Sequence, residues 1–115
     1  MTKVTIWHNP RCTKSRQTLA LLEERGLTPQ VRAYLDDAPT EAEIRAALKA
    51  LNLTPIELIR TGEAEFAALG LSRDSDDASL IRAMATTPKL IERPVVFANG
   101  KARIGRPPEQ VLDIL

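Results

Sequence analysis

The first 35 residues of the chain predict a strand, a helix and a second strand in succession, and this order constrains the fold more than any other feature. Residues 4–7 are β-branched and aromatic, which is typical of a strand. A helical pattern with inward-facing leucines follows over residues 13–25, and Gly26 stands where a left-handed helix cap is expected. Residues 31–35 predict the second strand. A connection of this length favours a parallel pair of strands in a right-handed βαβ unit.

Residues 40–90 predict a helical insertion. Thr40 and Glu43 have the spacing of a capping box, in which each side chain accepts a hydrogen bond from the other residue's backbone N–H. The amphipathic helix behind this box carries its apolar stripe at Ile44, Ala47, Leu48 and Leu51. Two short helices are predicted over residues 55–60 and 63–69, followed by a polar loop at 72–77. A further helix, which ends before Pro88, has its apolar residues at Leu80, Ile81, Met84 and Ala85.

The end of the chain predicts a hairpin and a closing helix. Residues 95–98 and 101–104 flank Asn99-Gly100, a strong signal for a two-residue hairpin. Pro107 suits the first position of a helix, whose apolar stripe comprises Pro108, Val111, Leu112 and Leu115. The order βαβ, helical insertion, ββα predicts an α/β fold of the thioredoxin/glutaredoxin-like class with a four-stranded mixed sheet. We expect residues 1–115 to form a single domain of this fold.

The charge and the residue counts exclude several classes of function. Lys and Arg number 16 against 15 Asp and Glu, so at a net charge of +1 no bulk attraction to nucleic acid or membranes is expected. One Cys and one His exclude an internal disulfide framework and argue against a structural metal site. No apolar run reaches the roughly 20 residues of a membrane span, and the N-terminus has no signal-peptide core. We therefore expect a cytoplasmic monomer without bound metal.

The one cysteine, Cys12, is predicted to lie after a strand and immediately before a helix. Backbone amides and the dipole at a helix N-terminus both favour a thiolate. Arg11, Lys14 and Arg16 add positive charge, and each of these effects lowers the pKa of the thiol because it stabilises the thiolate. Since the neighbouring residues are polar or charged, we expect Cys12 to be a reactive thiol rather than a buried apolar side chain.

Three nearby polar residues, His8, Asn9 and Ser15, are candidates for stabilising the thiolate. A lone His at a strand end is more often a simple hydrogen-bonding residue, although imidazole titrates near neutrality and could tune the thiol. Ser15 stands where a dithiol oxidoreductase carries its second cysteine, so Cys12 cannot form a CxxC disulfide. A redox cycle must then take its resolving thiol from outside, for example from glutathione. The other use of such a thiol is nucleophilic attack on an oxyanion, as in phosphatases.

Three arginines are candidates for binding an oxyanion: Arg60, Arg93 and Arg106. Arg93 directly precedes Pro94, where thioredoxin-like folds place a cis proline beside the thiol, so its guanidinium is expected to face Cys12. Arg106 lies at the start of the last predicted helix, whereas the pattern around Arg60 gives weaker support. A guanidinium suits a tetrahedral oxyanion because it donates paired hydrogen bonds and keeps its charge. Each arginine taken singly could equally be a solvated surface residue.

Three motifs together resemble the glutaredoxin-dependent arsenate reductase (ArsC) family. They are IWHNPRCTKSR at residues 6–16, ERPVV at residues 92–96 and GRP at residues 105–107. The resemblance extends over essentially the whole chain and is closest to the short, chromosomally encoded ArsC-like subgroup. Thr13-Lys14 stands where the best-characterised arsenate reductases carry Gly-Thr, which adds a bulkier side chain and a cation to the anion-binding turn.

The resemblance implies a mechanism as well as a fold. It implies that the thiolate of Cys12 attacks arsenate to form a covalent adduct, that glutathione then releases arsenite, and that glutaredoxin reduces the resulting mixed disulfide. The three arginines fall on the family's oxyanion-binding positions, and His8 and Ser15 fall on positions that help to hold the thiolate. The implied partners are thus arsenate or a similar oxyanion, glutathione as co-substrate and glutaredoxin, with no bound cofactor.

Two other functions are compatible with the same residues. A monothiol-type oxidoreductase acting on glutathionylated proteins fits the CxxS spacing from Cys12 to Ser15. A non-catalytic regulator of the Spx type, which binds RNA polymerase, would share the fold. That type senses redox state through a CxxC pair, which this chain lacks, and the presence of the three arginines favours an anion site over a pure interaction module.

Overall fold

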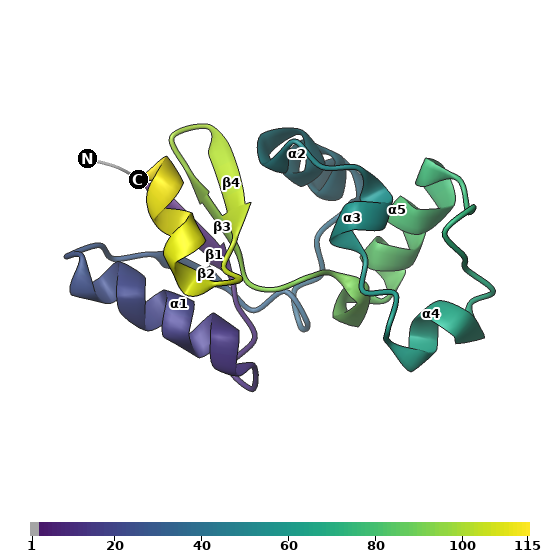
Figure 1. Cartoon of the computed structure of the whole chain (residues 1–115), viewed down its shortest axis with the longest axis horizontal. Coiled ribbons are helices and arrows are strands. Elements are labelled where there is room, and N and C mark those ends of the chain that lie inside the picture. Colours follow the sequence, from purple (N-terminus) through teal and green to yellow (C-terminus); the bar gives the residue numbers. More distant parts are fainter. Residues whose placement is uncertain (1–2) are drawn as a thin grey trace. The chain divides into compact units, whose positions relative to one another are not determined.

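In the computed structural model, which describes residues 3–115, the chain forms two compact units. Unit 1 contains the described residues up to Asp37 together with Arg93–Leu115, and unit 2 is Ala38–Glu92. Figure 1 shows both units coloured along the sequence. Unit 2 covers the segment in which the sequence predicts a helical insertion.

Unit 1 is built on a four-stranded sheet with the order β2-β1-β3-β4. Its strands are β1 (Val4–Trp7), β2 (Gln30–Arg32), β3 (Val95–Ala98) and β4 (Lys101–Ile104), and α1 (Thr13–Glu24) connects β1 to β2. β1 and β2 are parallel, whereas β1–β3 and β3–β4 are antiparallel. The predicted thioredoxin-like arrangement with a mixed sheet is therefore confirmed.

Two turns of unit 1 follow directly from local sequence. Asn99 and Gly100, between β3 and β4, both have positive φ, at 56° and 75°. This is the backbone of a type I′ hairpin turn, which Asn-Gly adopts at low cost. Gly26 has φ 77° just after α1, as expected for a left-handed helix cap.

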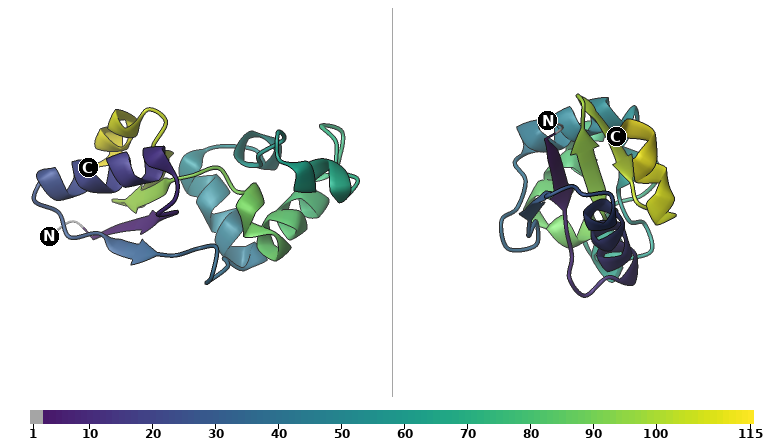
Figure 2. Two further views of the ribbon diagram at one scale, coloured as in Figure 1. Left: turned by 90° about the horizontal axis from the view of Figure 1, so that it is seen from below. Right: turned by 90° about the vertical axis from the view of Figure 1, so that its left-hand side faces the viewer.

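One face of the sheet is covered by α1 and by η2 (Pro108–Ile114), which Figure 2 shows on the same side of the strands. Alternate residues of β1 and β3 point to this face, because side chains alternate along a strand. The core that they form with the two helices consists of Val4, Ile6, Leu22, Val96, Ala98, Val111 and Ile114.

The closing helix differs from the prediction. It is a 3₁₀ helix that begins at Pro108, and Pro107 precedes it in an extended conformation. Because a 3₁₀ helix repeats every three residues, its buried positions are Pro108, Val111 and Ile114. The predicted stripe residue Leu115 is 39% exposed.

The second strand is also shorter than predicted. β2 ends at Arg32, and the backbone then turns, with the Tyr34 N–H donating to the carbonyl of Arg32 at 3.0 Å. Val31 and Leu35 are 48% and 42% exposed, respectively. The strand predicted over residues 31–35 is therefore confirmed only for Val31 and Arg32.

Unit 2 consists of helices. They are α2 (Glu41–Leu51), α3 (Pro55–Leu58), α4 (Ala64–Ala68), α5 (Asp77–Thr86) and the 3₁₀ helix η1 (Pro88–Leu90). Both α2 and α3 pack against α5. The buried residues of α2 are the four of its predicted apolar stripe. In α5 the buried residues include the predicted Leu80, Ile81 and Met84, with Ala83 in place of Ala85.

Local hydrogen bonds explain where the helices of unit 2 begin and end. The capping box of α2 is present, with the Glu43 N–H donating to Oγ1 of Thr40 at 3.1 Å and the Thr40 N–H donating to Oε1 of Glu43 at 3.0 Å. α3 ends two residues earlier than predicted because Ile59 leaves the helix in an extended conformation and forms an antiparallel bridge with Ile91. α4 is likewise one residue shorter at each end than the predicted 63–69.

Candidate active site

Cys12 is the N-cap residue of α1, as its position in the sequence predicts. Its backbone is extended, and its N–H donates to the carbonyl of Asn9 at 3.0 Å, which closes a tight turn between β1 and α1. The residue is only 9% exposed. The expectation that its charged neighbours would keep Cys12 out of the interior is therefore wrong. The polar side chains of Arg11 and Thr13 point to solvent while the thiol lies inward.

The pKa of the Cys12 thiol is lowered in spite of this burial. Burial by itself raises the pKa, because it penalises the charged thiolate. Three groups outweigh the effect of burial and lower the pKa. They are the backbone N–H of Ser15, the guanidinium of Arg93, which acts through a hydrogen bond and through its charge, and the backbone N–H of Lys14. The amides of the first turn thus act on a sulfur anion lying over the helix N-terminus.

Arg93 and Arg106 both reach Cys12 from the segments on either side of the β3–β4 hairpin. Nη2 of Arg106 lies 3.5 Å from Sγ of Cys12, and its Nε donates to the carbonyl of Arg93 at 2.8 Å. The peptide bonds Arg93–Pro94 and Arg106–Pro107 are both cis. The predicted cis proline after Arg93 is therefore confirmed, and unit 1 alone brings two guanidinium groups to one thiol.

His8, Asn9 and Ser15 form the inner side of the same turn. Nδ1 of His8 lies 2.7 Å from Oγ of Ser15, and the Asn9 N–H donates to that oxygen at 3.0 Å. The Ser15 residue is fully buried. Burial, followed by the charge of Arg16, lowers the pKa of His8. The hydroxyl of Ser15 thus holds the turn together, while its backbone N–H faces the sulfur of Cys12.

Arg16 has a role in this turn that the sequence analysis missed. Its Nη1 donates to the carbonyl of Pro10 at 2.9 Å, and its Nη2 donates to Oγ1 of Thr13 at 3.2 Å. The guanidinium therefore bridges the two ends of the turn that carries Cys12. The i, i+3 spacing of Thr13 and Arg16 was the available signal, since such pairs meet on a helix surface.

Arg60 lies in unit 2 and has carboxylate partners there. Its Nε donates to Oε1 of Glu63 and its Nη1 donates to Oε1 of Glu92, each at 3.1 Å. Lys89 extends the network, with Nζ 3.6 Å from Oε2 of Glu63 and 3.2 Å from Oε2 of Glu65. The pair with Glu92 could not be found from a sequence pattern, because Glu92 is 32 residues away from Arg60 along the chain.

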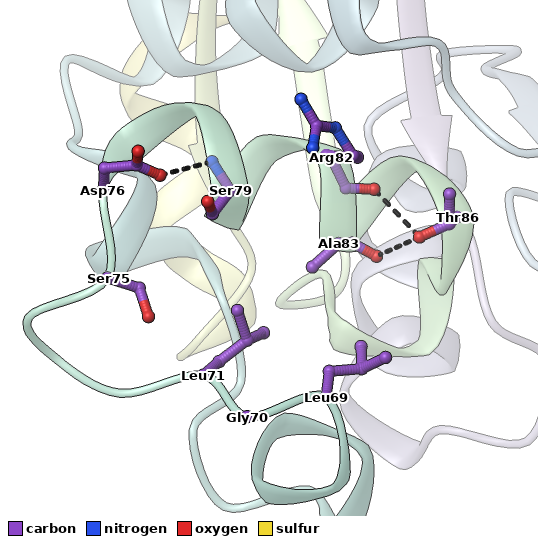
Figure 3. A pocket seen from close by; sticks show the side chains of 9 residues that line it. All are labelled: Leu69, Gly70, Leu71, Ser75, Asp76, Ser79, Arg82, Ala83 and Thr86. Carbon is purple, nitrogen blue, oxygen red and sulfur yellow. Dashed lines mark hydrogen bonds between the residues drawn. The ribbon is translucent and has the colours of Figure 1, made fainter.

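Unit 2 also carries a shallow pocket of about 540 Å³, shown in Figure 3. Leu69, Leu71 and Arg82 are among its lining residues, and neither a Cys nor a His is. Two of its polar side chains form hydrogen bonds with the backbone of α5: Asp76 accepts from the Ser79 N–H at 2.8 Å, and the Thr86 hydroxyl donates to the Arg82 carbonyl at 2.9 Å. The lining of the pocket therefore offers neither a thiol nor an imidazole that could activate one of its hydroxyls, and the turn around Cys12 is the candidate site.

Two kinds of feature are absent from residues 3–115. Within that range no three His, Cys, Asp or Glu side chains lie together so that they could hold a metal ion. No helix in the part of the chain that the structure describes is both long and apolar enough to span a membrane.

The fold and the site define a class of protein: a thioredoxin-like domain with one activated cysteine at a helix N-terminus and two arginines beside it. The model of the ArsC family matches residues 7–114. The chain therefore belongs to the ArsC family.

Individual relatives match over nearly their full length. The uncharacterized protein YfgD of Escherichia coli K12 is 52% identical over 118 residues, which cover 100% of this chain and 99% of that protein. An arsenate reductase of Neisseria meningitidis serogroup B is 43% identical, with 100% of both chains covered. The solved structure of an arsenate reductase from Vibrio cholerae superposes with a TM-score of 0.95 at 48% identity, over 99% of this chain and 98% of that one.

Proposed function

We propose that this protein is an arsenate reductase that uses glutathione and glutaredoxin as its reductants. The observation that carries the proposal is the position of Cys12, with a lowered pKa and with Arg106 at 3.5 Å from its sulfur. Relatives that match this chain end to end are named arsenate reductases, which supports the same substrate class.

In the proposed first step, the Cys12 thiolate attacks the arsenic atom of arsenate. A sulfur–arsenic bond forms, and one arsenic–oxygen bond breaks with loss of water after protonation. Arg93 and Arg106 would bind the remaining oxygens, because guanidinium groups donate paired hydrogen bonds to a tetrahedral oxyanion and stay charged at every relevant pH. Their pre-positioned charge also stabilises the negative charge that develops in the transition state.

In the second step, the thiolate of glutathione attacks the sulfur of Cys12. The electron pair of the sulfur–arsenic bond stays with arsenic, so that As(V) becomes As(III) and leaves as arsenite. The two sulfurs are oxidised to a mixed disulfide. The thiol of glutathione is needed because Ser15 stands where a second cysteine would resolve the adduct. Glutaredoxin then reduces the mixed disulfide and restores the Cys12 thiol.

The remaining predicted site residues enter the proposal in different ways. His8, Asn9 and Ser15 would act by holding the turn in which the thiolate forms. By resemblance, Arg60 is proposed as a third ligand of the oxyanion. Its Nε and Nη1 donate one hydrogen each to Glu63 and Glu92, so one hydrogen of Nη1 and both hydrogens of Nη2 would serve the anion.

The test is arsenate-dependent oxidation of NADPH in the presence of glutathione, glutaredoxin and glutathione reductase. We expect turnover with the wild-type protein and none with Cys12→Ser. We expect Arg93→Ala and Arg106→Ala mainly to raise KM for arsenate. Turnover that persists in Cys12→Ser would refute the proposal.

The lone thiol also favours a second candidate, a monothiol-type oxidoreductase that acts on glutathionylated proteins. The same assay separates the two when a glutathionylated protein replaces arsenate. Reduction of that protein without any activity on arsenate, alongside a working control enzyme, would transfer the proposal to the second candidate.

A further inference from the structure

Gly105 is a glycine of unit 1 that no backbone requirement explains. Three of the five glycines, Gly26, Gly70 and Gly100, have positive φ, which favours glycine by itself. Gly62 has ordinary φ and open space around the position of a Cβ. Gly105 also has ordinary φ, yet a Cβ there would find no room.

Two elements crowd the position that a Cβ of Gly105 would occupy. It would overlap Oγ1 of Thr18 on α1 and would lie 3.1 Å from Cγ2 of the same residue. It would also lie 2.9 Å from Cγ of Pro94. Thr18 is fully buried and its Oγ1 donates to the carbonyl of Lys14 at 2.8 Å, so its side chain is held in place. Pro94 is a ring with little freedom to move.

These neighbours are next to the groups that surround Cys12. Pro94 follows Arg93, and its carbonyl accepts from the Gly105 N–H at 3.0 Å. Arg106 follows Gly105 and contacts Sγ of Cys12 at 3.5 Å. Thr18 lies one turn beyond Ser15 on α1. At Gly105, the segment that carries Arg106 therefore lies against Pro94, which follows Arg93, and against α1, whose N-cap is Cys12.

We infer that Gly105 is a positioning residue for Cys12: its bare Cα lets the end of β4 lie directly against Thr18 and Pro94, which holds Arg93 and Arg106 beside the sulfur. A methyl group at this position separates β4 from α1 and moves both guanidinium groups away from Cys12. The inference deepens the proposed function, on which it rests for the identity of the reacting atom.

The loss of thiolate stabilisation expected in a Gly105 variant can be measured without arsenate. Alkylation by iodoacetamide, a neutral reagent, proceeds through the thiolate, so its rate as a function of pH reports how strongly the site stabilises that anion. In Gly105→Ala we expect the alkylation profile to move to higher pH, with a rate about threefold to tenfold lower on its acidic side. Gly62→Ala is the matched control, because the same methyl enters open space, and we expect it to follow the wild-type profile.

A double variant identifies the contact responsible. Thr18→Ala removes both atoms of Thr18 that a Cβ at position 105 would meet, whereas the approach to Cγ of Pro94 at 2.9 Å remains. Thr18→Ala/Gly105→Ala is therefore expected to recover part of the wild-type profile. A merely structural role for Gly105 would lower the melting temperature without moving the profile of the folded protein.

An unchanged profile in folded Gly105→Ala overturns the inference, as does a shifted profile that Thr18→Ala does not relieve even in part. If Gly105→Ala does not fold, the double variant decides, and its failure to recover both folding and low-pH alkylation overturns the inference as well. Because alkylation needs neither arsenate nor glutathione, a negative result in the turnover assay leaves this test intact.

Discussion

The contact between Arg106 and Cys12 predicts the effect of removing one guanidinium. In Arg106→Ala the charge 3.5 Å from Sγ is lost. Two opposite unit charges 3.5 Å apart attract by about 1.2 kcal/mol at the dielectric constant of water and by about 4.7 kcal/mol at an effective value of about 20. Arg106 is an exposed residue, so the lower figure is the appropriate one. The thiolate-to-thiol ratio of Cys12 should then fall by about fivefold to eightfold.

The assay is the second-order rate of iodoacetamide alkylation between about pH 5 and pH 9, measured with the melting temperature of each variant. Arg103→Ala is the matched control, because it removes the same charge from the neighbouring strand β4, where the Arg103 side chain donates to the Ala102 carbonyl at 2.9 Å. We expect Arg103→Ala to stay within about twofold of wild type, since the guanidinium of Arg103 is bound at the Ala102 carbonyl and not at the sulfur.

Two results would contradict this reasoning. An Arg106→Ala rate equal to that of wild type would mean that the contact contributes nothing to the thiolate. An equal fall in Arg103→Ala would mean that the general positive field of unit 1 acts on Cys12, rather than the particular guanidinium beside it.

Three further predictions concern stability. The pKa of Cys12 in the folded protein is lowered from its ordinary value of 9.0, so the thiolate stabilises the fold fully above pH 9.0, and this stabilisation is lost as the pH falls through the folded pKa. In chemical denaturation, the difference in unfolding free energy between wild type and Cys12→Ser should therefore decrease over that range of pH. Because the pKa of His8 is lowered from 6.5, the unfolded chain takes up a proton first on acidification, so stability should fall below about pH 6.5 more steeply in wild type than in His8→Asn. Arg60→Ala, which leaves two partly buried carboxylates without their shared partner, should lower the free energy of unfolding by about 1–2 kcal/mol. Exposed Arg73→Ala is its control, with a change expected below about 0.5 kcal/mol, and equal effects of the two substitutions would show that the ion pairs contribute nothing.

Elements specified by short-range interactions could be predicted well from the sequence. The Asn99-Gly100 turn, the Thr40–Glu43 capping box and the cap at Gly26 each depend on residues within a few positions of one another. The same holds for Cys12 at the start of α1, because a helix N-terminus is marked by its own sequence. A thiol with a lowered pKa was predictable for that reason.

Elements whose state depends on distant contacts were predicted less well. The run at residues 31–35 has the composition of a strand, but β2 ends at Arg32, which pairs with Trp7, the last residue of β1. The closing segment has an amphipathic pattern that suits an α-helix as well as the 3₁₀ helix that forms, and only packing against the sheet selects Ile114 over Leu115 as the buried residue. The burial of Cys12 among charged neighbours is a further example.

Residue identity and local backbone preference are enough to show that the chain has one thiol, that it lies at a helix N-terminus and that no second thiol is present. The packing of distant segments places particular arginines beside the sulfur. It brings Arg106 to Cys12 across 94 positions of the chain, and it pairs Arg60 with Glu92 across 32. The physical reason is that a guanidinium acts on a thiolate or a carboxylate only over a few ångströms, and sequence patterns do not encode distances between segments that meet through the packing of a core.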